Sequence, residues 1–262
     1  MPEGDTVHRT ARLLDRSLSG RLLTGTDFRV PQLATTDLSG STVTATVSRG
    51  KHLLTRIDGT DGSWTLHTHL KMEGAWRLHA PGERWRRPAH QARVVLETAD
   101  KVAVGFSLGI VELLPRDRED EAVGHLGPDL LGPDWDEDEA LRRLLEQPDR
   151  PIGEALLDQT RLAGIGNMYQ AELCFTSGVH PGTPVGEVPD LTRLVRRAKQ
   201  MLELNKERAV QSTTGALRER MWVYRRDNRP CRRCGTPVQV QMVGPAGRER
   251  ASYWCPSCQP AR

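Results

Sequence analysis

The sequence predicts an α+β fold made of a strand-rich N-terminal part, a helical part and a small metal-binding hairpin at the C-terminus. Residues 20–114 consist of short runs of β-forming residues separated by Gly, Asp and Ser. Apolar residues at helical spacing follow in residues 136–208. Four cysteines in two Cys-x-x-Cys pairs lie near the end. A length of 262 residues is enough for two cores, or for one core with an appendage.

The bulk composition is that of an ordinary globular protein, with 37% hydrophobic and 27% charged residues. No apolar run approaches the roughly 18 to 20 residues that a membrane span needs. The N-terminus lacks the basic region followed by an apolar region that marks a secretory signal. We therefore expect a cytoplasmic protein without membrane association.

The charge is distributed unevenly. Residues 191–262 carry 16 lysines and arginines against 5 acidic residues, which is a net charge of +11. Because the whole chain has a net charge of +3, the preceding part carries −8. A basic C-terminal third suggests a polyanionic partner, most often nucleic acid. A solvated helical face explains the charge equally well.

The strand-rich part is expected to begin with a short helix over residues 5–18. Val7, Ala11, Leu14 and Leu18 recur there at helical spacing, so this helix would hold the N-terminus in place. Short strands should follow, and several of them at this spacing predict a β-sandwich or barrel. The expected strands are residues 42–47, 52–57, 64–69, 76–78, 93–97 and 101–106.

An acidic stretch rich in Gly and Pro, residues 116–138, is expected to connect this part to the helices. Helices are predicted at residues 136–145, 151–159, 167–177 and 190–208, with Asp190 as an N-cap. The resulting domain boundaries are 1–118 for the strand-rich domain, 119–134 for the linker, 135–222 for the helical domain and 223–262 for the finger.

The cysteine spacing predicts a zinc site. Twenty residues separate the pair Cys231 and Cys234 from the pair Cys255 and Cys258, which is the spacing of a zinc ribbon. Each pair directs two thiolates to one point, and tetrahedral zinc takes four. Two disulfides are the alternative, but nothing marks the chain as secreted. We expect one structural Zn²⁺, and we expect the fifth cysteine, Cys174, to lie in a helical core.

The first residues carry a candidate nucleophile. If the initiator methionine is removed, Pro2 becomes the N-terminus and presents a secondary amine, whose pKa near roughly 8 leaves a reactive fraction at neutral pH. Such an amine forms a cationic iminium with a sugar aldehyde, and the neighbouring carboxylate of Glu3 can transfer protons. A proline and an acid at this position can also reflect processing of the N-terminus alone.

A second candidate site is the turn Gly164-Ile-Gly-Asn167. A helix is expected to begin at Asn167, and a helix N-terminus offers backbone N–H groups and a partial positive charge to a phosphate. An ordinary corner between two helices is the alternative. No G-x-G-x-x-G or Walker pattern is present, so we expect no nucleotide cofactor.

Taken together, these motifs identify a resemblance to a known family. The chain resembles the formamidopyrimidine-DNA glycosylase and endonuclease VIII family of base-excision repair enzymes over nearly its whole length. The motifs that carry the resemblance are Pro2-Glu3-Gly4-Asp5, Arg49-Gly50-Lys51, Leu156-Leu157-Asp158-Gln159 with Gly164 to Tyr169, and the four-cysteine finger. The resemblance implies an N-terminal β-sandwich, a helix-two-turn-helix domain and a zinc finger.

The resemblance to this family also implies catalytic roles for particular residues. Pro2 would attack C1′ of the damaged nucleotide, and Glu3 would assist base loss and ring opening as acid and base. Lys51 would contact the nucleotide or its phosphate, although an exposed hairpin lysine is the alternative. The implied activity is that of a bifunctional DNA glycosylase and AP lyase that nicks the strand by β/δ-elimination.

The implied DNA-binding residues are Asn167, Arg250 and Met72. Asn167 would hold the phosphate beside the flipped nucleotide. Arg250, five residues before Cys255, would hold the same backbone and so assist catalysis, with Arg248 as a competitor for that role. Met72 would fill the space that the nucleotide leaves, although a methionine in a strand is more often a core residue.

Two departures from the family bear on the substrate. The formamidopyrimidine branch has a loop with an Arg and a Phe that contact the orphaned base, whereas residues 106–111 contain no arginine. The lysine that precedes the Leu-Leu-Asp-Gln segment in the family is replaced near Gly153. We therefore expect an endonuclease VIII-like monomer that acts on oxidised pyrimidines in double- or single-stranded DNA. The alternatives are oxidised purines as substrates, or a non-catalytic zinc-ribbon protein that binds nucleic acid.

Overall fold

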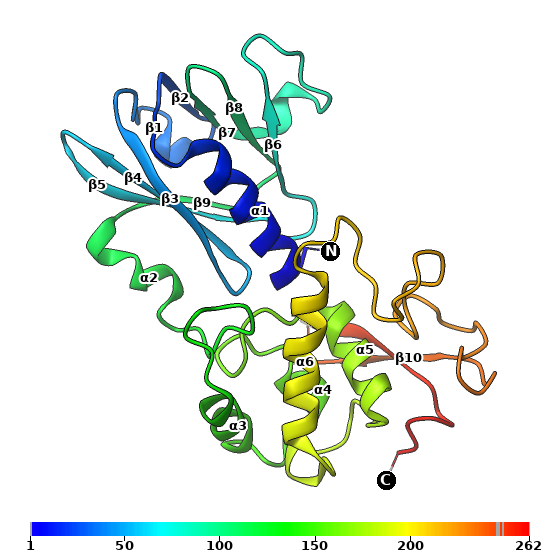
Figure 1. Cartoon of the computed structure of the whole chain (residues 1–262). Helices are drawn as coiled ribbons and strands as arrows, with labels where there is room; N and C mark the ends of the chain where they lie inside the picture. Colours follow the sequence, from blue (N-terminus) through cyan, green and yellow to red (C-terminus); the bar gives the residue numbers. More distant parts are fainter. Residues whose placement is uncertain (1, 245–246, 248, 262) are drawn as a thin grey trace. The chain divides into compact units, whose positions relative to one another are not determined.

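The computed structural model describes residues 2–244, 247 and 249–261. The chain divides into two compact units, Met1–His125 and Leu126–Arg262, and the division falls inside the segment 119–134 that we expected as a linker (Figure 1). Both ends of this segment are packed. Glu119 accepts hydrogen bonds from Arg56 in the first unit, and Leu130 is buried in the core of the second.

The first unit begins with helix α1, Gly4–Leu18, which confirms the predicted opening helix. Its apolar residues at helical spacing are fully buried, and Figure 1 shows the helix lying along β3. The Asp15 carboxylate accepts the backbone N–H of Thr46 at 2.8 Å, which joins α1 to β3 by a polar contact as well. The end of the chain that carries Pro2 is therefore attached to a rigid element.

The described residues of this unit form two antiparallel sheets that pack face to face, as the predicted β-sandwich requires. The five-stranded sheet has the order β1-β3-β4-β5-β9, and the four-stranded sheet has the order β2-β7-β8-β6. The strands are β1 Arg21–Leu22, β2 Gly25–Phe28, β3 Thr42–Arg49, β4 His52–Gly59, β5 Gly62–His69, β6 Ala75–His79, β7 Ala92–Glu97, β8 Val102–Phe106 and β9 Ile110–Pro115.

Three of these strands, β1, β2 and β9, were not predicted as separate elements. β1 has two residues, and β2 is the weak β-former sequence Gly-Thr-Asp-Phe, so local propensity could not identify them. β9 follows β8 after only three residues, and its pairing with β5 exists only in the folded sheet. Short 3₁₀ helices occupy Pro31–Leu33, Ala89–Gln91 and Arg116–Arg118, and α2 spans Asp120–Val123.

The second unit contains α3 Glu137–Leu145, α4 Ile152–Ala155, α5 Asn167–Ser177 and α6 Leu191–Asn205, with a 3₁₀ helix at Val185–Glu187. The carboxylates of Asp136 and Asp190 cap α3 and α6 by accepting a backbone N–H three residues later. The predicted helix 151–159 was too long, because the Asp158 carboxylate accepts the backbone N–H of Thr160 and forms a turn instead. No helix in the described part of the chain has the length and apolar character that crossing a bilayer requires.

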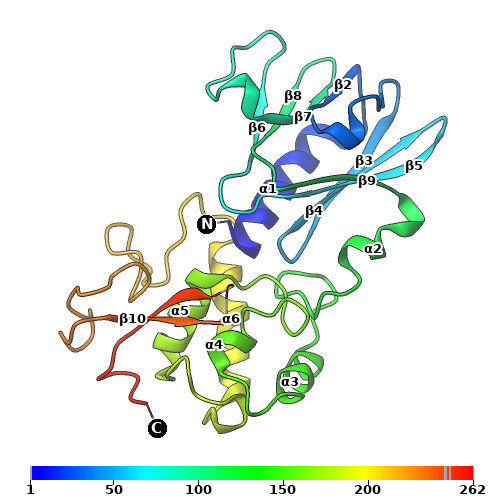
Figure 2. The same ribbon diagram turned by 180° about the vertical axis from the view of Figure 1, so that it is seen from behind.

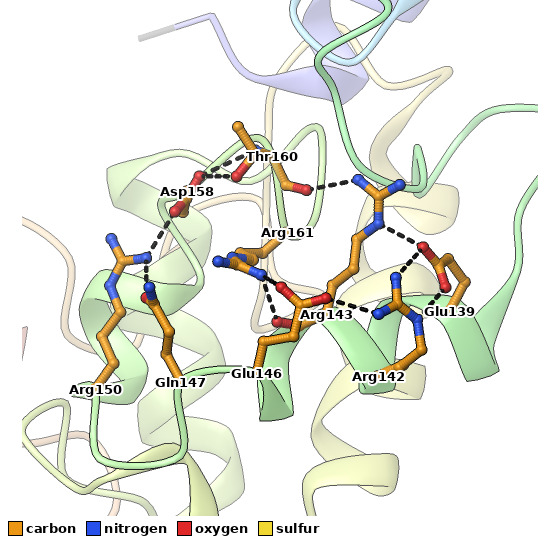
Figure 3. A network of polar contacts seen from close by, with 9 residues as sticks. All are labelled: Glu139, Arg142, Arg143, Glu146, Gln147, Arg150, Asp158, Thr160 and Arg161. Carbon is orange, nitrogen blue, oxygen red and sulfur yellow. Dashed lines mark hydrogen bonds and ion pairs between the residues drawn. The ribbon is translucent and has the colours of Figure 1, made fainter.

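A polar network fixes the segment that leads from α3 to α5 (Figure 3). Arg143 donates to the carbonyl oxygen of Thr160 at 2.9 Å, and Arg161 donates to that of Arg143 at 3.1 Å. Arg150 donates to the Asp158 carboxylate at 2.6 Å. Each guanidinium in Figure 3 also has a carboxylate partner, so this surface is close to neutral.

The finger is the hairpin of β10 Gln239–Val243 and β11 Arg250–Trp254, which lies beside α5 (Figure 2). Ala171 and Phe175 of α5 share a small core with Val238, Cys231 and Cys255. Cys174 is buried on the same helix, as predicted, and burial raises the pKa of its thiol to about 12.

One buried carboxylate connects α5 to the chain that enters the finger. Glu172 is fully buried and accepts the backbone N–H groups of Trp222, Val223 and Tyr224 at 2.8 to 2.9 Å, together with the hydroxyl of Thr213. Burial raises the pKa of Glu172, while these four donors oppose that change by stabilising the ionised form.

Replacing this carboxylate should destabilise the second unit. Glu172→Ala leaves three buried or partly buried N–H groups without this acceptor, so we expect the free energy of unfolding to fall by about 3 kcal/mol. Urea titration followed by far-UV circular dichroism measures this change. Glu187→Ala, at an exposed position of the same unit, is the control and should change stability little. Equal stability of the two variants would contradict the structural role of Glu172.

Candidate active site

A cavity of about 510 Å³ opens in the first unit beside Pro2. Pro2, Thr6 and Arg9 line one side of it, and Met72 and Glu73 line another. Glu3, the next residue along the chain, is fully buried at the N-cap position of α1. A helix N-terminus stabilises a nearby negative charge, which suits an ionised carboxylate at this position. Met1 itself lies outside the described residues.

Met72 is 60% exposed and lines this cavity, so it is not a core residue. It belongs to a tight turn in which the N–H of Gly74 donates to the carbonyl oxygen of Leu70 at 2.8 Å. Lys71 takes a left-handed backbone conformation there, with φ of 49°. A Cβ at Gly74 would lie 2.3 Å from that carbonyl oxygen, so the turn requires glycine. The backbone therefore presents Met72 to the cavity.

Lys51 lies in the two-residue turn between β3 and β4, where Arg49 pairs with His52. Gly50 adopts φ of 56°, which glycine tolerates and which closes the hairpin. Lys51 is near enough to His69 to influence its titration. The pKa of His69 is lowered to about 4, first by burial, then by the charges of Lys71 and Lys51.

Beneath this hairpin runs a chain of hydrogen bonds that we did not predict. Glu112 contacts Nδ1 of His67 at 3.0 Å, and Nε2 of His67 contacts Nδ1 of His52 at 2.8 Å. An ionised Glu112 can only accept, so His67 donates from Nδ1 and its Nε2 accepts from His52. Burial, followed by the charges of His69 and His67, lowers the pKa of His52 to about 3, which keeps it neutral.

The positions of the three histidines in the sequence already indicated that they share one face of the sheet. Strand alternation places His67 and His69 on the same face of β5, and the register of β4 and β5 puts His52 opposite His69. The opposite face of these strands carries Leu53, Ile57 and Leu66 into the sandwich core. Only the pairing register, which the sequence does not reveal, brings Glu112 next to His67.

In the second unit, the structure brings Asn167 close to the finger. Asn167 is the first residue of α5, and its Nδ2 donates to the carbonyl oxygen of Ala251 at 2.7 Å. Its Oδ1 is buried without a partner among the described residues. The neighbouring Arg250 lines a small cavity of about 150 Å³ together with Arg150. The candidate residues for phosphate contact are thus adjacent, although Asn167 has one N–H already engaged.

The turn before α5 is held by Gln159. Its side chain accepts the N–H of Gly164 at 3.1 Å and donates to the carbonyl oxygens of Leu157 and Ile165, each at 2.9 Å. Gly153, where the family lysine is replaced, is packed so closely that a Cβ would lie 2.9 Å from the carbonyl oxygen of Pro181. A larger residue therefore requires a different path of the chain at this position. Arg248, the competitor of Arg250, is outside the described residues.

The four finger cysteines form a candidate metal centre. The sulfur atoms of Cys231, Cys234, Cys255 and Cys258 lie within 4.8 Å of one another, and none forms a disulfide. Across the described residues no other cluster of three or more Cys, His, Asp or Glu has this geometry. The separation of 3.5 Å between the sulfurs of Cys234 and Cys255 approximates that of two thiolates about 2.3 Å from one tetrahedral ion. The donor set therefore fits a metal ion.

Comparison with known proteins decides the family. Residues 1–107 match the family model described as Formamidopyrimidine-DNA glycosylase N-terminal domain, and residues 126–217 match Formamidopyrimidine-DNA glycosylase H2TH domain. The chain belongs to the formamidopyrimidine-DNA glycosylase and endonuclease VIII family. This confirms the resemblance inferred from the motifs. The division of this family member into two units lies between the two matched regions.

Its similar relatives are named as endonuclease VIII proteins. The chain is 55% identical to a Streptomyces coelicolor protein named probable endonuclease 8 2, over 99% of this chain and 94% of that protein. It is 51% identical to DNA-(apurinic or apyrimidinic site) lyase Nei2 of Mycolicibacterium smegmatis over the full length of both. Identity to endonuclease 8 of Escherichia coli is 33%, over 99% of this chain and all of that protein. These relatives support the endonuclease VIII-like branch.

The fold of this family member also matches a solved structure described as a complex between the Lactococcus lactis Fpg and an abasic site containing DNA. The TM-score is 0.81 at 24% identity, and the match covers 99% of this chain and all of that one. At this identity the likeness establishes the fold. It confirms the α+β class with an N-terminal sandwich, helices and a C-terminal cysteine cluster.

The histidine group predicts how stability depends on pH. His52 and His69 have lowered pKa values of about 3 and about 4 in the fold, against about 6.5 when unfolded. Below pH 6.5 the unfolded chain binds more protons than the folded chain, so the stability present at neutral pH is lost progressively toward pH 4. Thermal unfolding between pH 7 and pH 5 should therefore show a falling midpoint.

The double variant His52→Gln/His69→Gln should flatten this pH dependence, because the groups that take up protons on unfolding are gone. His90→Gln, which changes an exposed histidine in the same unit, is the control and should keep the wild-type pH profile. A double variant whose midpoint falls as steeply as that of the wild type would rule out this assignment.

Proposed function

We propose that the protein is a bifunctional DNA glycosylase and AP lyase of base-excision repair that removes oxidised bases, with pyrimidines favoured. The observation that carries this proposal is the position of Pro2 in the wall of a cavity of about 510 Å³, with the buried carboxylate of Glu3 next to it. Family membership and relatives named as endonuclease 8 and as an AP lyase support the same activity.

The chemistry follows from a free prolyl nitrogen. Once Met1 has been removed, the Pro2 nitrogen attacks C1′ of the deoxyribose, and the C1′–N bond to the base breaks as the base takes up a proton. Opening of the sugar ring leaves an iminium between Pro2 and C1′. Because this iminium is cationic, the C2′ proton becomes acidic, and its loss expels the 3′ phosphate. A second elimination expels the 5′ phosphate, and hydrolysis releases Pro2.

Glu3 is proposed as the group that transfers protons in these steps. It is the residue next to the nucleophile, and its side chain is removed from solvent. A buried carboxylate can exist in protonated and ionised forms at useful pH values, so one group can serve as acid and then as base.

The nucleotide must leave the duplex to reach Pro2, which costs a few kcal/mol. We propose that phosphate contacts from Lys51, Asn167 and Arg250 offset this cost, and that Met72 fills the vacated space. The exposure of Met72 at the cavity supports this role, as does the adjacency of Asn167 to the strand that begins with Arg250. The proposed phosphate contact of Lys51 is supported by its position in a two-residue hairpin turn, which holds the backbone of Lys51 in place.

A preference for oxidised pyrimidines is supported by the short connection between β8 and β9. Only Ser107, Leu108 and Gly109 join the two strands. Ser107 has φ of 48°, and a Cβ at Gly109 would meet the Lys71 side chain at 2.1 Å, so the connection is compact. These three residues include no arginine that could contact the orphaned base. We further propose that the protein works as a monomer on DNA of the nucleoid.

Borohydride trapping tests the proposal. Reduction in the presence of duplex DNA that carries thymine glycol or an abasic site should give a covalent complex at Pro2, measured by gel shift and intact mass. An N-terminally extended variant, in which an uncleaved peptide precedes Pro2, should lose trapping at least about 100-fold because its nitrogen is an amide. The same peptide at the C-terminus is the control.

Glu3→Gln separates the two activities on the same assay. It retains the free nitrogen, so we expect trapping on an abasic duplex to persist in part, while excision of thymine glycol is lost. Absence of trapping in wild-type protein whose Met1 is shown by mass spectrometry to be removed would refute the proposed function.

We also propose that the four cysteines hold one structural Zn²⁺. Burial, then the neighbouring thiols, raises the pKa of Cys258 to about 12, whereas hydrogen bonds with Thr236 lower the pKa of Cys234 to about 6. A cation bound among the four sulfur atoms would favour the ionised form of all four. When bound, the ion supplies folding free energy to a hairpin whose own core is small.

Removal of the metal should therefore weaken DNA binding. A strong chelator should release one zinc per chain, measured by atomic absorption, and should reduce affinity for abasic DNA about 10-fold or more. Added zinc should restore both. Cys174→Ser, which changes the buried cysteine outside the finger, should retain the full metal content. Unchanged DNA affinity in metal-free protein would contradict the proposal.

A further inference from the structure

The connection between β6 and β7 is an unusual concentration of positive charge in an otherwise acidic part of the chain. Residues 80–91 contain three arginines and one acidic residue, and the adjoining strand ends add Arg77 and Arg93, whereas residues 1–190 carry a net charge of −8. Figure 2 shows this connection extending beyond the end of the four-stranded sheet. None of Arg77, Arg84, Arg86 and Arg87 has a carboxylate oxygen within 4.0 Å in the part of the chain that the structure describes.

Two other exposed arginines of this protein have carboxylate partners, which provides a comparison. Arg118, in the same unit, is 58% exposed and paired with Glu121 at 2.6 Å. Arg142, which is 59% exposed, contacts both Glu139 and Glu146 (Figure 3). The β6–β7 connection therefore differs from an ordinary salt-bridged surface. Glu83 is the single acidic residue of this connection and interacts with Arg86 through space, so the three arginines of the connection outnumber their counter-charge. An excess of guanidinium groups in one place favours the binding of a polyanion.

The connection is held in place by Trp85. The Trp85 ring meets the Phe106 ring edge-on at 5.7 Å on the outer face of the four-stranded sheet, and the Arg29 guanidinium lies 5.3 Å from its centre. Glu83 adds a second attachment by accepting the N–H of Ala80 at 2.9 Å. Trp85 is half-buried, whereas the flanking Arg84 and Arg86 are exposed. Two guanidinium groups are thus displayed on a fixed segment.

This surface continues to the cavity beside Pro2. Arg87 donates to the carbonyl oxygen of Glu73 at 3.1 Å and lines that cavity. It also lines a second hollow, of about 540 Å³, formed entirely by residues 83–89. The guanidinium groups of the connection therefore adjoin the cavity that Pro2 lines.

The chemistry of the surface favours phosphate over bases. One face of the Trp85 ring lies under Arg29 and the ring also contacts Phe106, so it is poorly placed to stack on an unpaired base. Guanidinium groups match phosphate oxygens in a fork geometry and carry their charge at every accessible pH.

We propose that Arg84 and Arg86 bind backbone phosphates of the DNA that flanks the lesion, outside the cavity of Pro2. This inference rests on the proposed function for the identity of the polyanion. The contact is independent of sequence and of damage, so it contributes to the binding of undamaged duplex as well. It adds to the basic C-terminal third a second phosphate-binding surface on the other unit.

The test is a salt titration of binding to undamaged duplex by full-length protein. If Arg84→Ala/Arg86→Ala removes two phosphate contacts, the slope of log K against log salt should become shallower by about 1.8, since each phosphate contributes about 0.9. Affinity at low salt should fall at least about 10-fold. Arg84→Lys/Arg86→Lys should retain most of the slope, because a point charge still displaces counterions.

Arg118→Ala is the matched control, because it removes another exposed arginine of the same unit that already has a carboxylate partner. It should leave the slope as in the wild type. A double alanine variant with the slope and affinity of the wild type overturns the inference. Failure of the proposed function would be a different result, namely absence of borohydride trapping in the wild type. The salt titration measures binding alone, so it would still test the two arginines in that case.

Discussion

The burial of one face of α1 against the five-stranded sheet is the constraint on which the candidate active site depends. An N-terminal residue ordinarily has great conformational freedom, and a reactive amine on a mobile end would rarely meet its target in a productive geometry. Here Val7, Ala11, Leu14 and Leu18 are almost completely buried, and Asp15 bonds to the backbone of β3. The cost of ordering the N-terminus is offset by the hydrophobic contacts of the whole helix.

Buried polar groups are used in the same way elsewhere in the molecule. Glu172 satisfies three successive backbone N–H groups and so determines where the chain leaves the helices for the finger. Gln159 fixes the turn that leads into α5 by bonding to three backbone groups of that turn. Both side chains have several partners, which is why desolvating them is tolerated. The residues proposed to contact phosphate therefore lie on segments that are already rigid.

The arginines of this protein fall into two groups, those with a carboxylate partner and those without one. Those of α3 and its neighbours are paired with carboxylates, whereas those of the β6–β7 connection are not. Burial and adjacent positive charge lower the pKa values of His52 and His69, so these two side chains are neutral and add no repulsion near Lys51. Net charge alone would have pointed only to the C-terminal third, and not to the β6–β7 connection, as a candidate surface for nucleic acid.

Short sequence patterns were enough to determine several properties of this protein. The cysteine spacing, the Asp190 cap, the periodicity of α1 and the motif at Pro2 each express a short-range chemical requirement, and they sufficed for the family, the fold class and the candidate nucleophile. Tertiary structure decided what depends on distant partners. The strand β9, the contact of Glu112 with His67 and the engagement of Asn167 by Ala251 all require residues 40 or more positions apart to meet. Pairing register and side-chain burial arise only when the whole chain is packed, so no local pattern could specify them.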